Sequence, residues 1–300
     1  MRAHVLGSAA GGGFPQWNCG CDNCVLVRAG DPSVRPRTQD SLAMTSAGAA
    51  WLLVNASPDI GRHIERFAPL HPRGRRDTPL GAIALTNGDL DHVVGLLSLR
   101  ESQPLVILAT ERVRAGLVEQ NAMLRTLARH PDQVKWKRLE LGQELRLEDV
   151  GLGVTAVPAP GKLPVHLMGV LEPSPEDNVA LRVRDLAGGA TVVVATAMGS
   201  LEAAPSIVQG ADAVLFDGTF WSEEELVERG LGRARARDMA HVPIGGQKGS
   251  LAGLAGVPMG RRIYTHVNNT NPVLRDRSPE RSAVEAAGWE VAHDGLEVVL

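Results

Sequence analysis

The sequence has 300 residues, of which 44% are hydrophobic, and this content is sufficient for the buried core of one large domain or two smaller ones. The formal net charge is −3, and the charged residues are spread along the chain without the basic stripe that a nucleic-acid backbone requires. The first residues lack the apolar segment of a secretory signal, and no apolar run of about 18 residues occurs. We therefore expect a cytoplasmic protein that neither binds nucleic acid nor inserts into a membrane.

Short apolar runs that end in turn residues predict the strands of the N-terminal part. The first strand, Arg2 to Leu6, leads into Gly11 to Pro15, where glycines and a proline prevent regular structure. A second strand at residues 50–55 is followed by Ser57, which is suited to cap a helix, and by Pro58, which is suited to its first position. The pattern predicts a strand, a turn and a helix in succession.

The same succession recurs at Ala82 to Thr86, where a turn that begins with Asn87 precedes a helix predicted from Val93 to Leu99. Further strands are predicted at 105–109, 153–157, 179–183, 191–195, 213–216 and 262–265, and further helices at 112–129 and 279–287. Many short strands, partly in hairpin-like succession and partly alternating with helices, favour a layered α/β sandwich. No long linker or repeat interrupts the chain, so we expect a single domain over residues 1–300.

Three cysteines, Cys19, Cys21 and Cys24, lie in a turn-rich loop at about residues 11–30. They are too close together for a disulfide framework, and thiolates at this spacing can converge on one ion, for which tetrahedral Zn²⁺ is the natural choice. A structural zinc site needs a fourth ligand, and His241, His266, Asn269 or a neighbouring subunit could supply it. A homodimer would be consistent with the last choice, and free thiols are the alternative to a metal site.

A second cluster of metal-ligating residue types follows the strand at residues 82–86. Asp89, Asp91 and His92 stand on a turn directly before a helix, and loops at strand ends are common places for functional sites. The alternative is that Asp91 only caps the helix. A second strand, ending at Thr265, delivers His266 into an asparagine-rich turn, which supports a shared site although a merely hydrogen-bonded histidine stays possible.

In this order, these features resemble the metallo-β-lactamase superfamily, whose ligands lie on an H-x-H-x-D-H loop and on later strand ends. The resemblance implies an αββα sandwich. Asp91, His92 and His266 match family ligands, whereas Asn87 and Asp89 stand where the two early histidines are usual. The stretch 157–161 also lacks the usual histidine, and 196–199 lacks the usual bridging aspartate, so one metal is favoured over two.

Within this superfamily the chain is most similar to the family of the B proteins of pyrroloquinoline quinone (PQQ) biosynthesis. The matching stretches are 6–19, 55–60, 216–221, 241–246 and 266–272. The resemblance implies a structural zinc at the cysteines and a role in making PQQ from a Glu/Tyr-containing peptide. That role has two readings, iron-dependent hydroxylation of the tyrosine ring in the excised Glu-Tyr unit and carriage or export of the product or a precursor.

The ligand types favour the first reading. Two histidines with one or two carboxylates, and with open positions, are typical of non-haem Fe(II) oxygenases, whereas catalytic zinc prefers more nitrogen or sulfur. We therefore predict Fe(II), or another divalent metal, at Asp89, Asp91, His92 and His266, with these residues as the catalytic set. The expected activity is oxygenation of a small dipeptide-like precursor of PQQ.

Three further residues are predicted to contact the substrate. Asp217 ends a strand and could bind a substrate amine or orient a ligand, although capping the next turn would explain it equally. His241 could face the substrate, act as a proton donor or reach the zinc, and Asn269 is expected at the substrate or at the cysteines. A carrier of PQQ or its precursor remains the alternative function, and a zinc hydrolase is disfavoured by Asn87, Pro160 and Ala197.

Overall fold

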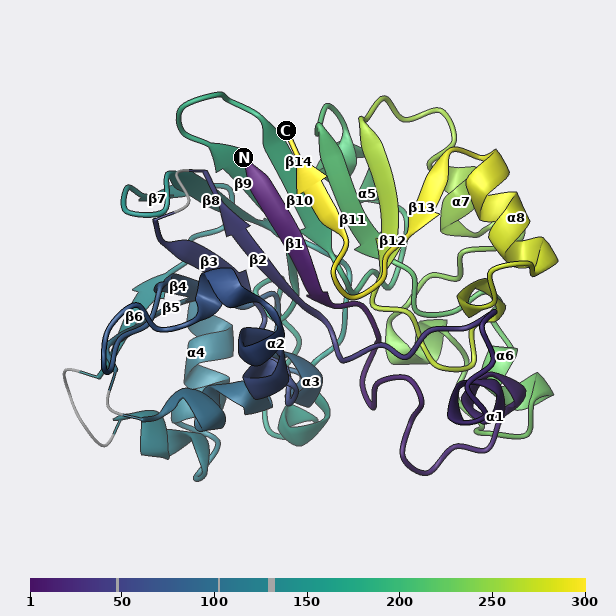
Figure 1. Ribbon diagram of the computed structural model, residues 1–300, viewed down its shortest axis with the longest axis horizontal. Helices are drawn as coiled ribbons and strands as arrows, with labels where there is room; N and C mark the ends of the chain where they lie inside the picture. The colour runs from purple at the N-terminus through teal and green to yellow at the C-terminus, as the bar shows by residue number, and fades with distance from the viewer. Residues whose placement is uncertain (47–48, 102, 129–132) are drawn as a thin grey trace.

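The computed structural model describes residues 1–46, 49–101, 103–128 and 133–300. In this part of the chain, two mixed sheets of seven strands face each other, and helices cover their outer faces (Figure 1). The predicted αββα sandwich is therefore confirmed. None of the helices in the described ranges is long and apolar enough to cross a membrane.

The two sheets have the same mixed construction. The first has the strand order β14 (Glu297–Val299), β1 (Arg2–Gly7), β2 (Ser41–Thr45), β3 (Trp51–Val54), β4 (Leu80–Ala84), β5 (Leu105–Ala109) and β6 (Val134–Arg138). The second has the order β13 (Trp289–Val291), β12 (Arg261–Thr265), β11 (Ala213–Asp217), β10 (Thr191–Ala195), β9 (Val179–Asp185), β8 (Leu152–Pro158) and β7 (Glu144–Leu147). Strands β3 to β6 and β10 to β13 pair in parallel, so the ends of β4, β11 and β12 each open into loops on one edge of their sheet.

The core consists of three apolar layers. One lies between the sheets and contains fully buried Leu52, Val154 and Leu215, and the other two lie between each sheet and its helices. The α-helices are α1 (Asp22–Arg28), α2 (Ile60–Arg66), α3 (Leu90–Val93), α4 (Glu111–Val118), α5 (Ala204–Val208), α6 (Glu225–Glu228), α7 (Ser250–Gly253) and α8 (Pro279–Ala286). Short 3-10 helices occur at Ala68–Leu70, Val94–Leu99, Leu124–Ala128, Val165–Leu167, Arg237–Met239 and Pro272–Leu274. Figure 1 shows α2, α3 and α4 on one side of the sandwich and α7 and α8 on the other.

The sequence predicted the start of α8 correctly and the start of α2 incorrectly. The hydroxyl of Ser278 accepts a hydrogen bond from the Arg281 N–H at 3.0 Å, and Pro279 takes the first position of α8. Ser57, by contrast, does not cap α2, because its hydroxyl donates to the Gln39 carbonyl at 3.2 Å. The helix α2 begins at Ile60 instead.

Other elements differ from the prediction. The helix expected at 112–129 is α4 followed by a 3-10 helix, and its last residue, Arg129, lies outside the described residues. The helix expected from Val93 to Leu99 is mostly 3-10, and α1 begins at Asp22 and includes Cys24, where only a loop was expected. Strands β2, β6, β7, β13 and β14 were not predicted. Several of them are short or carry charged residues, and their strand conformation depends on pairing with a neighbour.

Candidate functional site

The predicted Asp/His residues line a cavity of about 320 Å³ where the loops after β4, β11 and β12 converge. Asp89, Asp91 and His92 reach it from the first sheet, and His266 reaches it from the second. The sheets are joined here by a bridge between Asn87 and Asn178 and by a hydrogen bond from Val179 N to the Thr86 carbonyl at 2.9 Å. Residues that are far apart in the sequence therefore form one site.

Asp91, His92 and His266 form the first candidate metal site. One ligand atom from each lies within 4.8 Å of the others. Asp91 and His92 project together because α3 begins immediately before them, and His266 follows β12 directly. His266 has a φ of 56°, a left-handed conformation that is unfavourable for a residue with a side chain and that is common where a functional group must be held in place.

The orientation of His92 suits a metal ligand. Its Nδ1 lies 2.8 Å from Oδ1 of Asn87, which can only accept, so Nδ1 carries the proton and donates it. Its Nε2 is buried and has no hydrogen-bond partner among the described residues. A buried nitrogen lone pair without a partner is costly, and a cation between His92, Asp91 and His266 would satisfy it.

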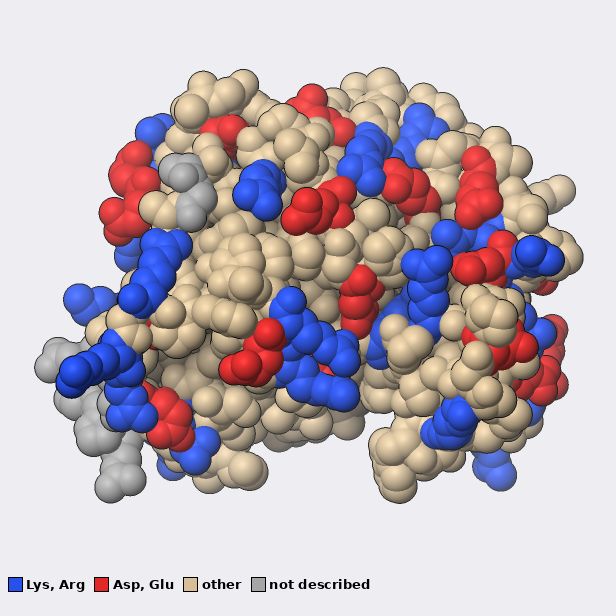
Figure 2. All heavy atoms as spheres, in the orientation of Figure 1, with Lys and Arg blue, Asp and Glu red and all other residues tan. Residues whose placement is uncertain are grey.

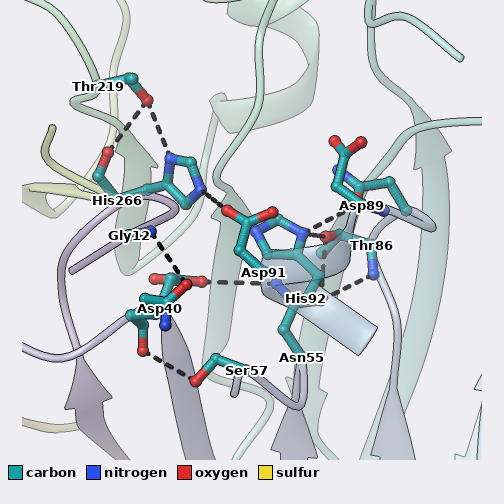
Figure 3. A network of polar contacts seen from close by, with 12 residues as sticks. Gly12, Asp40, Asn55, Ser57, Thr86, Asp89, Asp91, His92, Thr219 and His266 are labelled. Atoms are coloured by element: carbon teal, nitrogen blue, oxygen red, sulfur yellow. Dashed lines mark hydrogen bonds and ion pairs between the residues drawn. The ribbon is translucent and has the colours of Figure 1, made fainter. Parts of the chain in front are cut away.

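Besides Asn87, Thr86 and Asn55 help to hold His92 in this orientation, and Figure 3 shows both near its ring. The N–H and hydroxyl of Thr86 both lie 3.1 Å from Oδ1 of Asn55, and the Thr86 hydroxyl oxygen lies 3.1 Å from Nδ1 of His92. Asn55 itself adopts a left-handed φ of 59°, which asparagine tolerates better than most residues. These supporting roles were not predicted, although Asn55 ends one predicted strand and Asn87 directly follows another.

His266 bridges Asp91 and Thr219. Its Nε2 lies 3.2 Å from Oδ2 of Asp91, and its Nδ1 lies 2.9 Å from the Thr219 hydroxyl. Burial alone would lower the pKa of His266, but the hydrogen bond to Asp91 and the charges of Asp91, Asp40 and Asp217 raise it to about 9. The charges of His92 and His266 likewise outweigh burial and hold the pKa of Asp91 below its usual range. Figure 3 shows this pair beside Asp40 and His92.

Asp217 and His241 form a pair on the other side of His266. Together with His266 they make a second group that could hold a metal. However, the fully buried carboxylate of Asp217 already accepts hydrogen bonds from Met198 N at 2.8 Å, from the Thr219 hydroxyl at 2.6 Å and from His241 Nδ1 at 2.7 Å. This bonding favours a carboxylate that orients His241, whose ring lies 5.5 Å from that of His266, over a metal ligand.

The remaining predicted residues occupy different places. Asp89 lines the cavity but lies outside both metal-ligating groups, and burial together with the charge of Asp91 raises its pKa. His241 lines the cavity, as expected for a residue that contacts substrate, and it does not reach the cysteines. Thr219, which the sequence analysis missed, joins Asp217, His241 and His266 through one hydroxyl group.

Cys19, Cys21 and Cys24 converge as predicted, with their sulfur atoms within 4.8 Å of one another. The side-chain amide of Asn269 faces all three, with Nδ2 at 3.1 Å, 3.6 Å and 3.3 Å from the respective Sγ atoms. Rotation of this amide by half a turn would direct Oδ1 to the same point, which suits a fourth oxygen ligand. Asn269 is therefore placed at the cysteines and is not among the residues that line the Asp/His cavity.

Comparisons with known proteins agree with this geometry. The beta-lactamase superfamily domain matches residues 50–267. Coenzyme PQQ synthesis protein B of Methylobacterium nodulans is 47% identical over the full length of both chains, and that of Pseudomonas fluorescens is 40% identical, also over both full lengths. The crystal structure of Zn²⁺-bound PqqB from Methylobacterium extorquens has a TM-score of 0.92 and 43% identity and covers 100% of both chains. A diphosphatase of the PhnP family, 19% identical with a TM-score of 0.68, covers 99% of this chain and 97% of its own and shares the fold.

Proposed function

The chain belongs to the family of coenzyme PQQ synthesis protein B and has a role in PQQ biosynthesis, and we propose that this role is the metal-dependent oxygenation of a dipeptide-like precursor derived from Glu and Tyr. One observation carries the proposal. Two imidazoles and one carboxylate, from His92, His266 and Asp91, converge on the wall of a cavity large enough for a small substrate. A facial set of two histidines and one carboxylate with open positions is typical of non-haem Fe(II) oxygenases.

The donor atoms fit a divalent cation. His92 offers a buried Nε2 without a partner, and the hydrogen bond between His266 and Asp91 holds a proton at a position that a cation could take. When bound at these residues, Fe(II) would supply the one-electron chemistry with O₂ that amino-acid side chains cannot provide. Asn87, at the position of a family histidine, holds His92 and leaves fewer nitrogen donors for zinc hydrolase chemistry.

The chain's own side chains provide binding and proton transfer. Hydroxylation of the phenol ring by O₂ places one oxygen atom on the ring, and a reductant must supply two electrons, with two protons, to convert the other oxygen atom into water. His241 can relay such a proton at the cavity, because Asp217 accepts from its Nδ1 and fixes the orientation of the ring. Lys162, the only Lys or Arg among the residues that line this cavity, can pair with a substrate carboxylate, and Phe220 offers an apolar wall for the ring.

We assign the cysteine cluster to a structural zinc ion. Three thiolates and the Asn269 amide would supply four protein ligands, as in structural zinc sites. The cysteine site would then stabilise the fold, and the Asp/His site would carry out the reaction.

The test is the metal content and substrate-dependent O₂ uptake of anaerobically purified protein, measured with a Glu-Tyr peptide and a reductant. We expect the double variant Asp91→Ala/His92→Ala to lose iron and O₂ uptake and to keep one zinc. The matched control, His71→Ala/Asp77→Ala, removes the same residue types far from the cavity and should change neither quantity. O₂ uptake that is absent from the iron-loaded wild-type protein, together with tight PQQ binding by the double variant, would favour a carrier.

A further inference from the structure

A second cavity, of about 270 Å³, lies on the other side of the glycine loop from the Asp/His cavity. Gly11 lines the Asp/His cavity, whereas Gly12 and Gly13 line the second one. The remaining walls come from residues 14–15 and 36–39, from Asp59, Arg62 and Arg66 at and within α2, and from Asp294. None of the proposed metal ligands lines it, so it is a separate site.

The carboxylates of this second cavity are already engaged by other donors. Asp294 accepts hydrogen bonds from Thr38 N at 2.8 Å and from the Ser8 hydroxyl at 2.9 Å. Asp59 accepts from Gln39 N at 3.0 Å, and its distance of 3.7 Å to Arg62 is long for an ion pair. Both carboxylates are thus hydrogen-bonded to other groups, and Asp294 acts on Arg37 through its charge without forming an ion pair.

Three arginines line the same cavity, and the deepest of them lacks a partner. Arg37 is only 6% exposed, its Nε and Nη1 have no hydrogen-bond partner, and it forms no ion pair within the described part of the chain. Burial lowers the pKa of Arg37 to about 10, so the guanidinium is still charged at neutral pH. A buried charged donor that is left unpaired is expensive, and a bound anion is the simplest way to satisfy it.

Arg62 and Arg66 extend the positive charge toward solvent. Both lie on α2 and line the cavity, and the Arg62 side chain is 65% exposed. Figure 2 shows Lys and Arg side chains gathered in the region where α2 lies in Figure 1. The basic groups thus run from the surface to the buried guanidinium, an arrangement that attracts small anions.

We propose that this second cavity binds a small oxyanion, the carboxylate or phosphate group of a small molecule, which pairs with Arg37 and is neutralised on its outer side by Arg62 and Arg66. A guanidinium binds either group through charge-assisted N–H donors, and Arg37 has no ion-pair partner within the described residues to compete with a bound anion. This site is independent of the proposed oxygenation, because it shares no side chain with the Asp/His cavity.

Isothermal titration calorimetry of the full-length, metal-loaded protein with inorganic phosphate and with succinate tests the proposal. We expect one saturable site in the wild type and in Asp91→Ala/His92→Ala, since the anion does not bind at the proposed metal ligands. Arg62→Gln/Arg66→Gln should weaken binding by about tenfold, whereas Arg75→Gln/Arg76→Gln, with the same charge change in an exposed loop, should not. The tighter of the two ligands identifies the chemical group.

Arg37→Met should abolish binding, and circular dichroism would show whether this buried variant folds. If it does not, the comparison of the two double arginine variants still decides the question. Absence of saturable binding in the wild type, equal binding by both arginine variants, or binding that disappears in Asp91→Ala/His92→Ala would each overturn the proposal.

Discussion

The cysteine cluster and the Asp/His cluster differ in how their side chains are supplied and in what faces them. The three cysteines come from one short segment, a loop and the first turn of α1, and the side-chain amide of Asn269 faces all three. Asp91, His92 and His266 come from two sheets and face a cavity. The loop after β12 contributes to both, because Asn269 follows His266 three positions later in the sequence. The difference teaches that a cluster with four protein ligands suits a stabilising metal, whereas a three-residue cluster on a cavity wall leaves positions open for chemistry.

The largest effect is expected from substitutions in the loop after β12, which contributes one residue to each cluster. His266→Ala removes one imidazole from the Asp/His cluster, so we expect iron to be lost and O₂ uptake to fall at least about a hundredfold. Zinc content should be unchanged. Elemental mass spectrometry and the O₂ assay measure both quantities. Asn269→Ala is the reciprocal variant, and it should lower the affinity for zinc more than that for iron. Equal loss of both metals in both variants would mean that the clusters are not separable.

Cys24→Ser should act on stability. Cys24 is fully buried, and replacing it removes one thiolate of the proposed zinc site, so we expect the free energy of unfolding to fall by at least about 3 kcal/mol. Urea denaturation with and without a chelator measures the loss, and the chelator should destabilise only the wild type. Val25→Ser, on the same helix but exposed, is the control and should change stability little. A chelator effect that survives in Cys24→Ser would contradict the zinc assignment.

Asp217→Asn should affect chemistry without removing metal. The variant weakens the support of His241 and disturbs Thr219, so we expect kcat to fall by about 10- to 100-fold with KM and iron content nearly constant. Steady-state O₂ uptake over a range of pH values measures this. Asp212→Asn, at the exposed residue directly before the same strand, is the matched control. Loss of iron from Asp217→Asn would instead indicate that Asp217 is a metal ligand.

The smallest expected effect is on the pH dependence of stability, and it involves a glutamate that contacts the loop after β12. Glu225 lies 3% exposed beside Thr270, and burial raises its pKa to about 7 from an ordinary value of 4.5. Between these pH values the folded state holds a proton that the unfolded state releases, so this contribution to stability is present at low pH and is lost as the pH rises to 7. The loss is at most roughly 3 kcal/mol.

Glu225→Gln should remove this part of the pH dependence. Urea denaturation at pH 5 and pH 8 measures it, and the free energy of unfolding of the variant should fall less between these values than that of the wild type. Glu228→Gln, exposed on the same helix, should behave as the wild type does. Identical pH profiles for all three proteins would show that Glu225 is not the titrating group.

Short-range sequence patterns determined much of the fold and the local half of each site. Apolar runs such as Thr191 to Ala195 become buried strands wherever they pair, so their positions could be predicted without knowing their neighbours. Asp91 and His92 are adjacent in the chain, and the three cysteines lie in one short segment that ends in the first turn of α1, so their convergence also follows from local geometry.

Tertiary structure decided the contacts between distant segments. The sequence offered His241, His266 and Asn269 as equal candidates to complete the cysteine site, and the packing of the loop after β12 placed Asn269 there and His266 at Asp91. Asn87 stands at a position that holds a metal ligand in the superfamily. In the folded protein its side chain instead accepts a hydrogen bond from His92 and orients that ring. These choices depend on how two separately formed sheets face each other, and the free energy of that packing has no signature in any short stretch of sequence.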